Sequence, residues 1–168
     1  MPRTTHRSIA LFAVILLVGS TAHAQRRAGR APSPTLVVNA LNTTAVAQSA
    51  GSTRATVLPN DVLRYTLTLT NPTSRALSNV ELRNPIPAGV RYVTGSAHAS
   101  RADARLEFSA DGGKSWAAEP VETAVVAGQT VTRPIPVERY THIRWVVVGT
   151  VAPNAMVRAD FEARVGGA

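Results

Sequence analysis

The sequence predicts an all-β protein in which two antiparallel sheets pack as a sandwich. From Pro34 onward nearly every segment either alternates polar and apolar residues with a period of two or is rich in β-branched residues, as strands are. The chain has 11 Gly and 11 Pro, and its turn signals recur about every 8–12 residues, which favours a sandwich. Strands do not alternate with helical patterns, so an α/β fold is excluded, and a closed barrel is the alternative.

The expected strands follow one another along the whole of this region. They are residues 35–41, 62–70, 77–83, 90–95, 106–109, 115–117, 121–126, 130–135, 142–151 and 156–165. The strand at 62–70 ends before Pro72, because proline lacks a backbone N–H and restricts the residue before it. Residues 84–89 are expected to form a turn, and residues 111–113 (Asp-Gly-Gly) a hairpin turn, since glycine supplies positive φ angles.

The alternation also predicts which side chains are buried. In residues 62–70 the leucines and Tyr65 share one face, and arginine and threonines share the other. Residues 156–165 alternate with the same regularity, so we expect an integral, half-buried strand and not a frayed tail. The predicted core is carried by Tyr65, Leu67, Trp145 and Phe161.

Residues 1–24 have the pattern of a secretory signal peptide. Two arginines give a positive start, residues 9–18 are an unbroken apolar run, and residues 22–24 (Ala-His-Ala) form a cleavage site before Gln25. The alternative, a transmembrane anchor, needs about 20 apolar residues, twice the length of this run. We therefore expect a chain exported to the periplasm or the extracellular cell surface, with no integral membrane span after cleavage.

Residues 25–34 are expected to form a flexible basic arm before the sandwich domain at residues 35–168. The arm holds Arg26, Arg27 and Arg30 among prolines and small or polar residues, so it has little to bury. Such an arm would attract an anionic envelope polymer; the alternative is a plain spacer. The net charge falls from +8 to +3 without the five arginines before residue 35, and aromatics are 5%. Both values argue against a nucleic-acid partner.

Four motifs stand in order along the predicted domain: residues 57–71 (VLPNDVLRYTLTLTN), 87–96 (PAGVRYVTGS), 143–145 (IRW) and 149–154 (GTVAPN). Together they resemble the conserved repeat domain of bacterial surface proteins, known as the domain of unknown function 11 family, over about residues 35–166. The resemblance implies an immunoglobulin-like two-sheet antiparallel sandwich in an exported protein, and it brings no catalytic residues. Asn60 and Asn154 replace the family's usual glycines, and asparagine tolerates left-handed backbone best among other residues. Asn84 replaces the usual aspartate, which argues against a calcium site there.

Residues 109–116 (SADGGKSW) fit the Asp-box pattern, which resembles hairpins of sialidases and other propellers. The resemblance implies a structural brace in which Asp111 accepts hydrogen bonds from turn amides and Trp116 packs inward; sugar binding is the alternative. Lys114 is the one lysine of the chain, and in this turn we expect it to be solvated. A buried lysine for an isopeptide bond is thereby excluded.

No pattern in the sequence indicates catalysis, a cofactor or a metal. The chain has no Cys, and after the predicted cleavage only His98 and His142 remain as histidines, without a companion at metal-ligand spacing. The carboxylates are expected singly on outward positions or in turns, although two could still meet across strands. We therefore expect a protein that is not an enzyme.

The sequence favours an exported structural or protein-interaction module of the bacterial cell envelope or surface. Its expected partner is another envelope or surface protein, or an anionic envelope polymer. The alternative is an extracellular glycan-binding module. An exposed Trp116 or Tyr140 beside a groove would favour that alternative, because glycan binders of this size present aromatic platforms.

Overall fold

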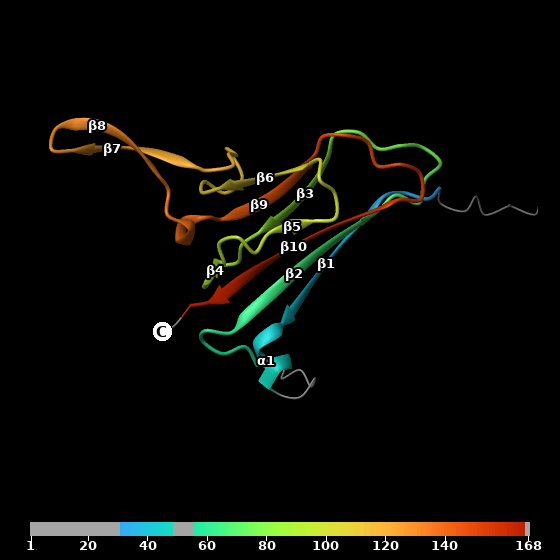
Figure 1. Ribbon diagram of the computed structural model, residues 1–168, viewed down its shortest axis with the longest axis horizontal. Coiled ribbons are helices and arrows are strands. Elements are labelled where there is room, and N and C mark those ends of the chain that lie inside the picture. Colours follow the sequence, from blue (N-terminus) through green and yellow to red (C-terminus); the bar gives the residue numbers. More distant parts are fainter. Residues whose placement is uncertain (1–30, 49–55, 167–168) are drawn as a thin grey trace, which may run out of the picture. The chain divides into compact units, whose positions relative to one another are not determined.

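In the computed structural model, which describes residues 31–48 and 56–166, strands form two antiparallel sheets and a separate two-stranded ribbon (Figure 1). The first sheet has the order β1–β2–β10–β4, with β5 also paired to β10, and the second has the order β3–β9–β6. The ribbon consists of β7 and β8. The elements are β1 (Thr35–Asn42), α1 (Thr43–Gln48), β2 (Val62–Thr70), β3 (Val80–Pro85), β4 (Val90–Tyr92), β5 (His98–Ala99), β6 (Ala104–Ser109), β7 (Val121–Val126), β8 (Gln129–Pro134), η1 (Val137–Arg139), β9 (His142–Val147) and β10 (Met156–Val165). The predicted signal peptide and the three arginines of the predicted arm lie outside the described residues.

The core confirms the predicted all-β sandwich. Phe161 on β10 and Trp145 on β9 belong to different sheets, and their ring centroids lie 6.2 Å apart. Leu67, Trp145 and Phe161 are buried, as their parity predicts, whereas Tyr65 is half-buried and stacks on Phe161 at 5.0 Å. Each named strand of the two sheets pairs only within its own sheet, so the closed barrel is excluded for the described residues. The last strand, β10, lies between β2 and β4 at the centre of the first sheet.

Three predicted strands, those at residues 62–70, 121–126 and 156–165, have the bounds of β2, β7 and β10. The predicted strand at 77–83 and the turn at 84–89 are displaced, because β3 continues through Pro85, and Asn84 is buried opposite Ile143. The strand expected at 90–95 ends at Tyr92.

The long strand expected at 142–151 divides after Val147. The N–H of Val148 donates to the carbonyl of Asp103 at 3.0 Å, and the N–H of Gly149 donates to the Asp103 carboxylate at 3.1 Å. The side chain of Arg101 bonds the same carboxylate and lowers the pKa of Asp103 to about 2. The hydrogen bonds to Asp103 therefore hold the chain after Val147 as a loop. Beyond this loop Val151 pairs with Leu77 only as an isolated bridge.

A short helix, α1, follows β1 and was not predicted from the sequence. The Oδ1 of Asn42 accepts the N–H of Ala45 at 2.9 Å, which is the usual N-cap bond. Ala45 is fully buried. Six residues make fewer than two helical turns, so no periodic pattern could reveal this helix.

The turns adopt the left-handed backbone that their residues indicate. Asn60 and Asn154 have φ angles of 68° and 57°, which confirms that asparagine stands at positions suited to glycine. The ribbon is closed by Ala127 and Gly128, both at positive φ, as a type I′ hairpin turn requires. Beside Asn154, the fully buried Asn71 donates its amide to three loop carbonyls and holds the loops at this end together.

Candidate binding site

The hairpin at residues 109–116 is braced by Asp111, as the Asp-box resemblance implies. Its carboxylate accepts the backbone N–H groups of Lys114 and Ser115 at 3.0 Å, and the hydroxyl groups of Ser115 at 2.6 Å and Ser109 at 2.7 Å. These bonds, the Ser115 hydroxyl first among them, hold the pKa of Asp111 well below its ordinary value. Lys114 is exposed, as expected. The carboxylate is thus committed to the turn.

Trp116 is half-buried on the outer face of the second sheet, and the prediction that it packs inward is wrong. Its Nε1 donates to the carbonyl of Gly113 at 3.0 Å. The guanidinium groups of Arg144 and Arg83 lie 4.5 Å and 5.5 Å from the ring centroid. These arginines share the outward parity of β9 and β3, so they hold the indole against the sheet surface by cation–π contacts. The two guanidinium groups therefore lie against part of the ring surface that a sugar would use.

Two carboxylates meet on this outer face, and each is bonded to arginine. Arg144 donates its Nε to Glu107 at 2.8 Å and its Nη1 to Glu81 at 3.4 Å. Glu81 also accepts the Nε of Arg83 at 2.6 Å. With two glutamates and two arginines the cluster is neutral as a whole. It is suited to stiffening the sheet, and it carries no net charge that would attract an anion.

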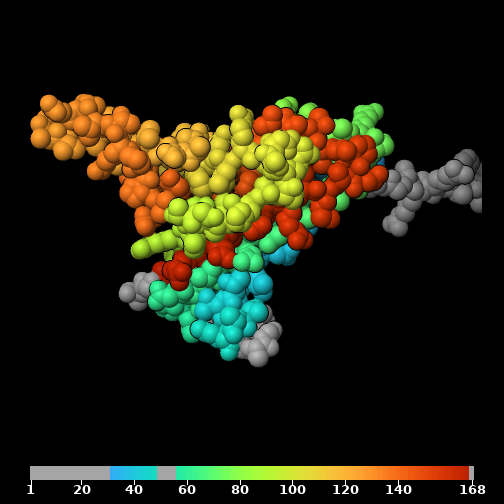
Figure 2. All heavy atoms as spheres, viewed as in Figure 1, coloured from blue at the N-terminus to red at the C-terminus, as the bar shows by residue number. Residues whose placement is uncertain are grey.

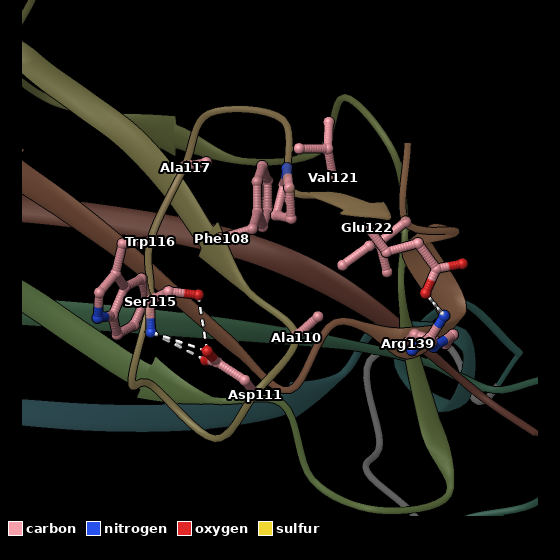
Figure 3. A pocket seen from close by; sticks show the side chains of 11 residues that line it. Phe108, Ala110, Asp111, Ser115, Trp116, Ala117, Val121, Glu122 and Arg139 are labelled. Atoms are coloured by element: carbon pink, nitrogen blue, oxygen red, sulfur yellow. Dashed lines mark hydrogen bonds and ion pairs between the residues drawn. The ribbon is translucent and has the colours of Figure 1, made fainter. Parts of the chain in front are cut away.

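A hollow of about 400 Å³ with a mixed polar and apolar lining lies between the braced hairpin and the base of the ribbon (Figure 3). Its lining includes Asp111, Phe108, Glu122 and Arg139, and also the half-buried Trp116. Glu122 is bonded by Arg139 and by the Nε of Arg133, the latter at 2.9 Å, and these bonds lower the pKa of Glu122. The ion pair ties β7 to the segment after β8, so it fixes the base of the ribbon.

An apolar hollow of about 470 Å³ lies on the other side of Phe108, which lines both hollows. The ring of Phe108 stacks on Tyr140 at 4.8 Å and lies tilted against Tyr92 at 5.0 Å, and all three rings line this hollow. Glu119 also lines it, and burial followed by the charge of Glu119 raises the pKa of Tyr140. The hollow offers aromatic and aliphatic surface with one carboxylate at its side.

The two histidines of the described residues lie in unrelated places. His98 is exposed on β5, and His142 is half-buried at the start of β9, where its Nδ1 lies 3.1 Å from the Thr141 hydroxyl. Within residues 31–48 and 56–166, no three histidine, aspartate or glutamate side chains are grouped so as to hold a metal. In the same residues no helix has the length and apolar character to cross a membrane.

The carboxylate of Asp61 lies in a turn, as expected, but it does not face the solvent. Asp61 is buried, 3% exposed, and its Oδ2 accepts the side-chain amide of Asn42 at 2.7 Å and the N–H of Leu58 at 2.8 Å. It therefore joins the end of β1 to the turn before β2. Its role is to hold these segments together.

The ribbon carries Val125, the most exposed large apolar side chain among the described strands, and two further exposed valines. Val121, Val125 and Val126 are 57%, 72% and 52% exposed, and the ribbon's atoms are uncovered in the face drawn in Figure 2. One face of the ribbon is uncharged, because Glu122 and Arg133 both lie on the other face and pair there. The residues of the uncharged face are Val121, Thr123, Val125, Thr130, Thr132 and Pro134.

Sequence reasoning found the ribbon strands but not the uncharged face or the two hollows. The sequence of β7 does indicate its uncharged face, because the one charged residue of the strand, Glu122, has opposite parity to Val121 and Val125. The hollows depend on Phe108 meeting Tyr140, 32 residues away in the sequence, which no local pattern reports. No family model matches the chain, and no curated protein matches it.

Proposed function

We propose that the protein is an exported, non-enzymatic interaction module of the bacterial cell envelope or surface, and that it binds another envelope protein through its β7–β8 ribbon. The observation that carries the proposal is the uncharged, β-branched face of the ribbon, with Val125 at 72% exposure. Valine and threonine on a pleated ribbon have few rotamers to lose on binding, so a flat apolar partner surface gains contact at low entropic cost.

Two further features support a docking role. The strands of the ribbon pair only with each other, so the ribbon contributes little to either sheet. Its base is nevertheless fixed by the Glu122–Arg139 ion pair and by the hydrogen bond from the N–H of Ile135 to the carbonyl of Pro120. An arm anchored at its base and apolar at its surface is suited to protein recognition. The resemblance to surface-protein repeats and the predicted signal peptide support the cell envelope or surface as the proposed location.

Site-specific photo-crosslinking in the cell that makes the protein tests this function. A photoreactive residue at Val125 should give a protein adduct, and one at Arg158, which is exposed on β10 away from the ribbon, should not. Val121→Asp should abolish the Val125 adduct, because it places a charge on the same face. Equal adducts at both positions, or none at Val125 in the exported protein, would contradict the proposal.

The second candidate is the glycan-binding module, and the apolar hollow favours it. Tyr140 is half-buried and lines the hollow together with Glu119, whereas Trp116 lines the first hollow and has two arginines against its ring. Titration calorimetry with an uncharged envelope polysaccharide, which the predicted basic arm would not attract, separates the two candidates. If the protein is a glycan-binding module, the unmodified chain gives binding heat, Tyr140→Ala loses it and Val125→Asp keeps it. If it is a protein-interaction module, neither the unmodified chain nor either variant gives binding heat.

A further inference from the structure

The outer edge of the first sheet is a strand without the usual protection against pairing. Within the described residues β1 pairs with β2 alone, so its other edge carries unpaired backbone groups. Among the described strands longer than two residues, β1 is the one with no charged residue, and it has no proline. Edge strands of soluble proteins are normally protected by charges, prolines or bulges, because a bare edge pairs with another chain.

Strand β1 exposes apolar side chains on both faces of the sheet. Leu36 and Val38 stand opposite Leu69 and Leu67, so they lie on the core face, yet both are 43% exposed. The second sheet has only three strands among the described residues, so it does not cover the core-facing side chains of β1. On the opposite face Val37 is 51% exposed. The strand is thus an edge with uncovered apolar surface above and below it.

We propose that β1 pairs antiparallel with β1 of a second copy of this chain, so that the first sheets of two molecules form one continuous sheet across a two-fold axis. The absence of charge on β1 favours a second copy, because two identical edges then meet without repulsion, although the domain as a whole is basic. An isologous pair also covers the exposed core face of both copies at once. This surface is separate from the β7–β8 ribbon, so the inference stands independently of the proposed function.

The parity of β1 fixes the register of the pair. Directly opposed residues of antiparallel strands share a face, and a two-fold axis normal to the sheet keeps both core faces on one side. The two residue numbers in each opposed pair must therefore add to an even number. This means that one residue of β1 lies opposite the same residue of the second copy. Asn42 is already bonded to Asp61 and caps α1, which excludes the register that would use it. Of the registers centred on the middle of β1, the one that leaves Asn42 out places Val38 opposite Val38 of the second copy. In that register Leu36 lies opposite Ala40 of the second copy.

Cysteine substitution tests the register directly, because the chain has no cysteine of its own. The full chain is expressed and the product that the cell makes is purified. Val38→Cys should form a disulfide-linked dimer under mild oxidation, since opposed Cα atoms lie about 4.5–5.5 Å apart, within disulfide range. Leu36→Cys is the matched control: the two copies of residue 36 would be four residues apart along the strands, about 13 Å, and should not link.

Sedimentation of the unmodified protein gives the second measurement. We expect a concentration-dependent dimer that Val37→Lys weakens at least tenfold, since it places like charges at the shared edge. Val148→Lys, on a valine that is 65% exposed and lies away from β1, should leave the dimer unchanged. Circular dichroism of each variant confirms that it is folded. A protein that is monomeric at all concentrations, a dimer indifferent to Val37→Lys, or equal linking in the Leu36→Cys and Val38→Cys variants would each overturn the proposal.

Discussion

Replacing Phe161 should lower the free energy of unfolding more than any neighbouring change, because its ring joins the aromatic side chains of the core. Phe161 is 0% exposed, and its centroid lies 5.0 Å from Tyr65, 6.2 Å from Trp145 and 6.4 Å from Tyr92. Phe161→Ala removes the ring and leaves a cavity, which costs about 3–5 kcal/mol. Phe161→Leu keeps most of the apolar volume but loses the ring contacts, so we expect a loss of about 2 kcal/mol.

Urea denaturation followed by tryptophan fluorescence measures both losses. With an m value of about 2 kcal/mol per molar urea, Phe161→Ala should move the midpoint down by about 2 M and Phe161→Leu by about 1 M. Thr68→Ala is the control, because Thr68 lies on the outer face of the same sheet and should cost less than about 1 kcal/mol. Equal midpoints for Phe161→Ala and Thr68→Ala would refute the assignment of the two faces.

Four further predictions concern the turns and the chain before the domain. Asp111→Asn should lower the thermal midpoint at pH 7; because the pKa of Asp111 is lowered by folding, its contribution is present above about pH 4 and is lost as the pH falls further, so the difference from the unmodified protein should shrink in acid. A difference that stays constant with pH would contradict this. Asn154→Gly should leave stability nearly unchanged, and Asn154→Val should cost about 1–2 kcal/mol by thermal unfolding, since the backbone is left-handed there. N-terminal sequencing of the exported protein should give Gln25 as the first residue; a start more than a few residues away would refute the predicted cleavage site. Deleting residues 25–34 should leave the thermal midpoint unchanged but reduce retention on an anionic envelope polymer at low salt; equal retention would leave only the spacer alternative.

The features predicted well from the sequence are those that a local rule decides. Burial of Leu67 and Phe161 follows from a period of two, because successive side chains of a strand point to opposite faces. The left-handed turn at Asn154 follows from the conformational tolerance of asparagine. The features missed depend on distant partners. Trp116 lies outside the core because two arginines of other strands lie against its ring, and β3 begins late because its register is set by β9.

The central position of β2 has a mechanical consequence. Both β1 and β10 run antiparallel to β2, so they run parallel to each other, and Thr35 and Met156 stand at the same level beside Thr70. Thr35 and Val165 therefore lie at opposite ends of the ladder. A tensile force between these two residues would act along the strands and load the hydrogen bonds of both ladders together in shear, since those bonds are perpendicular to the strands. The domain would resist stretching between its ends much better than peeling from the free edge of β1.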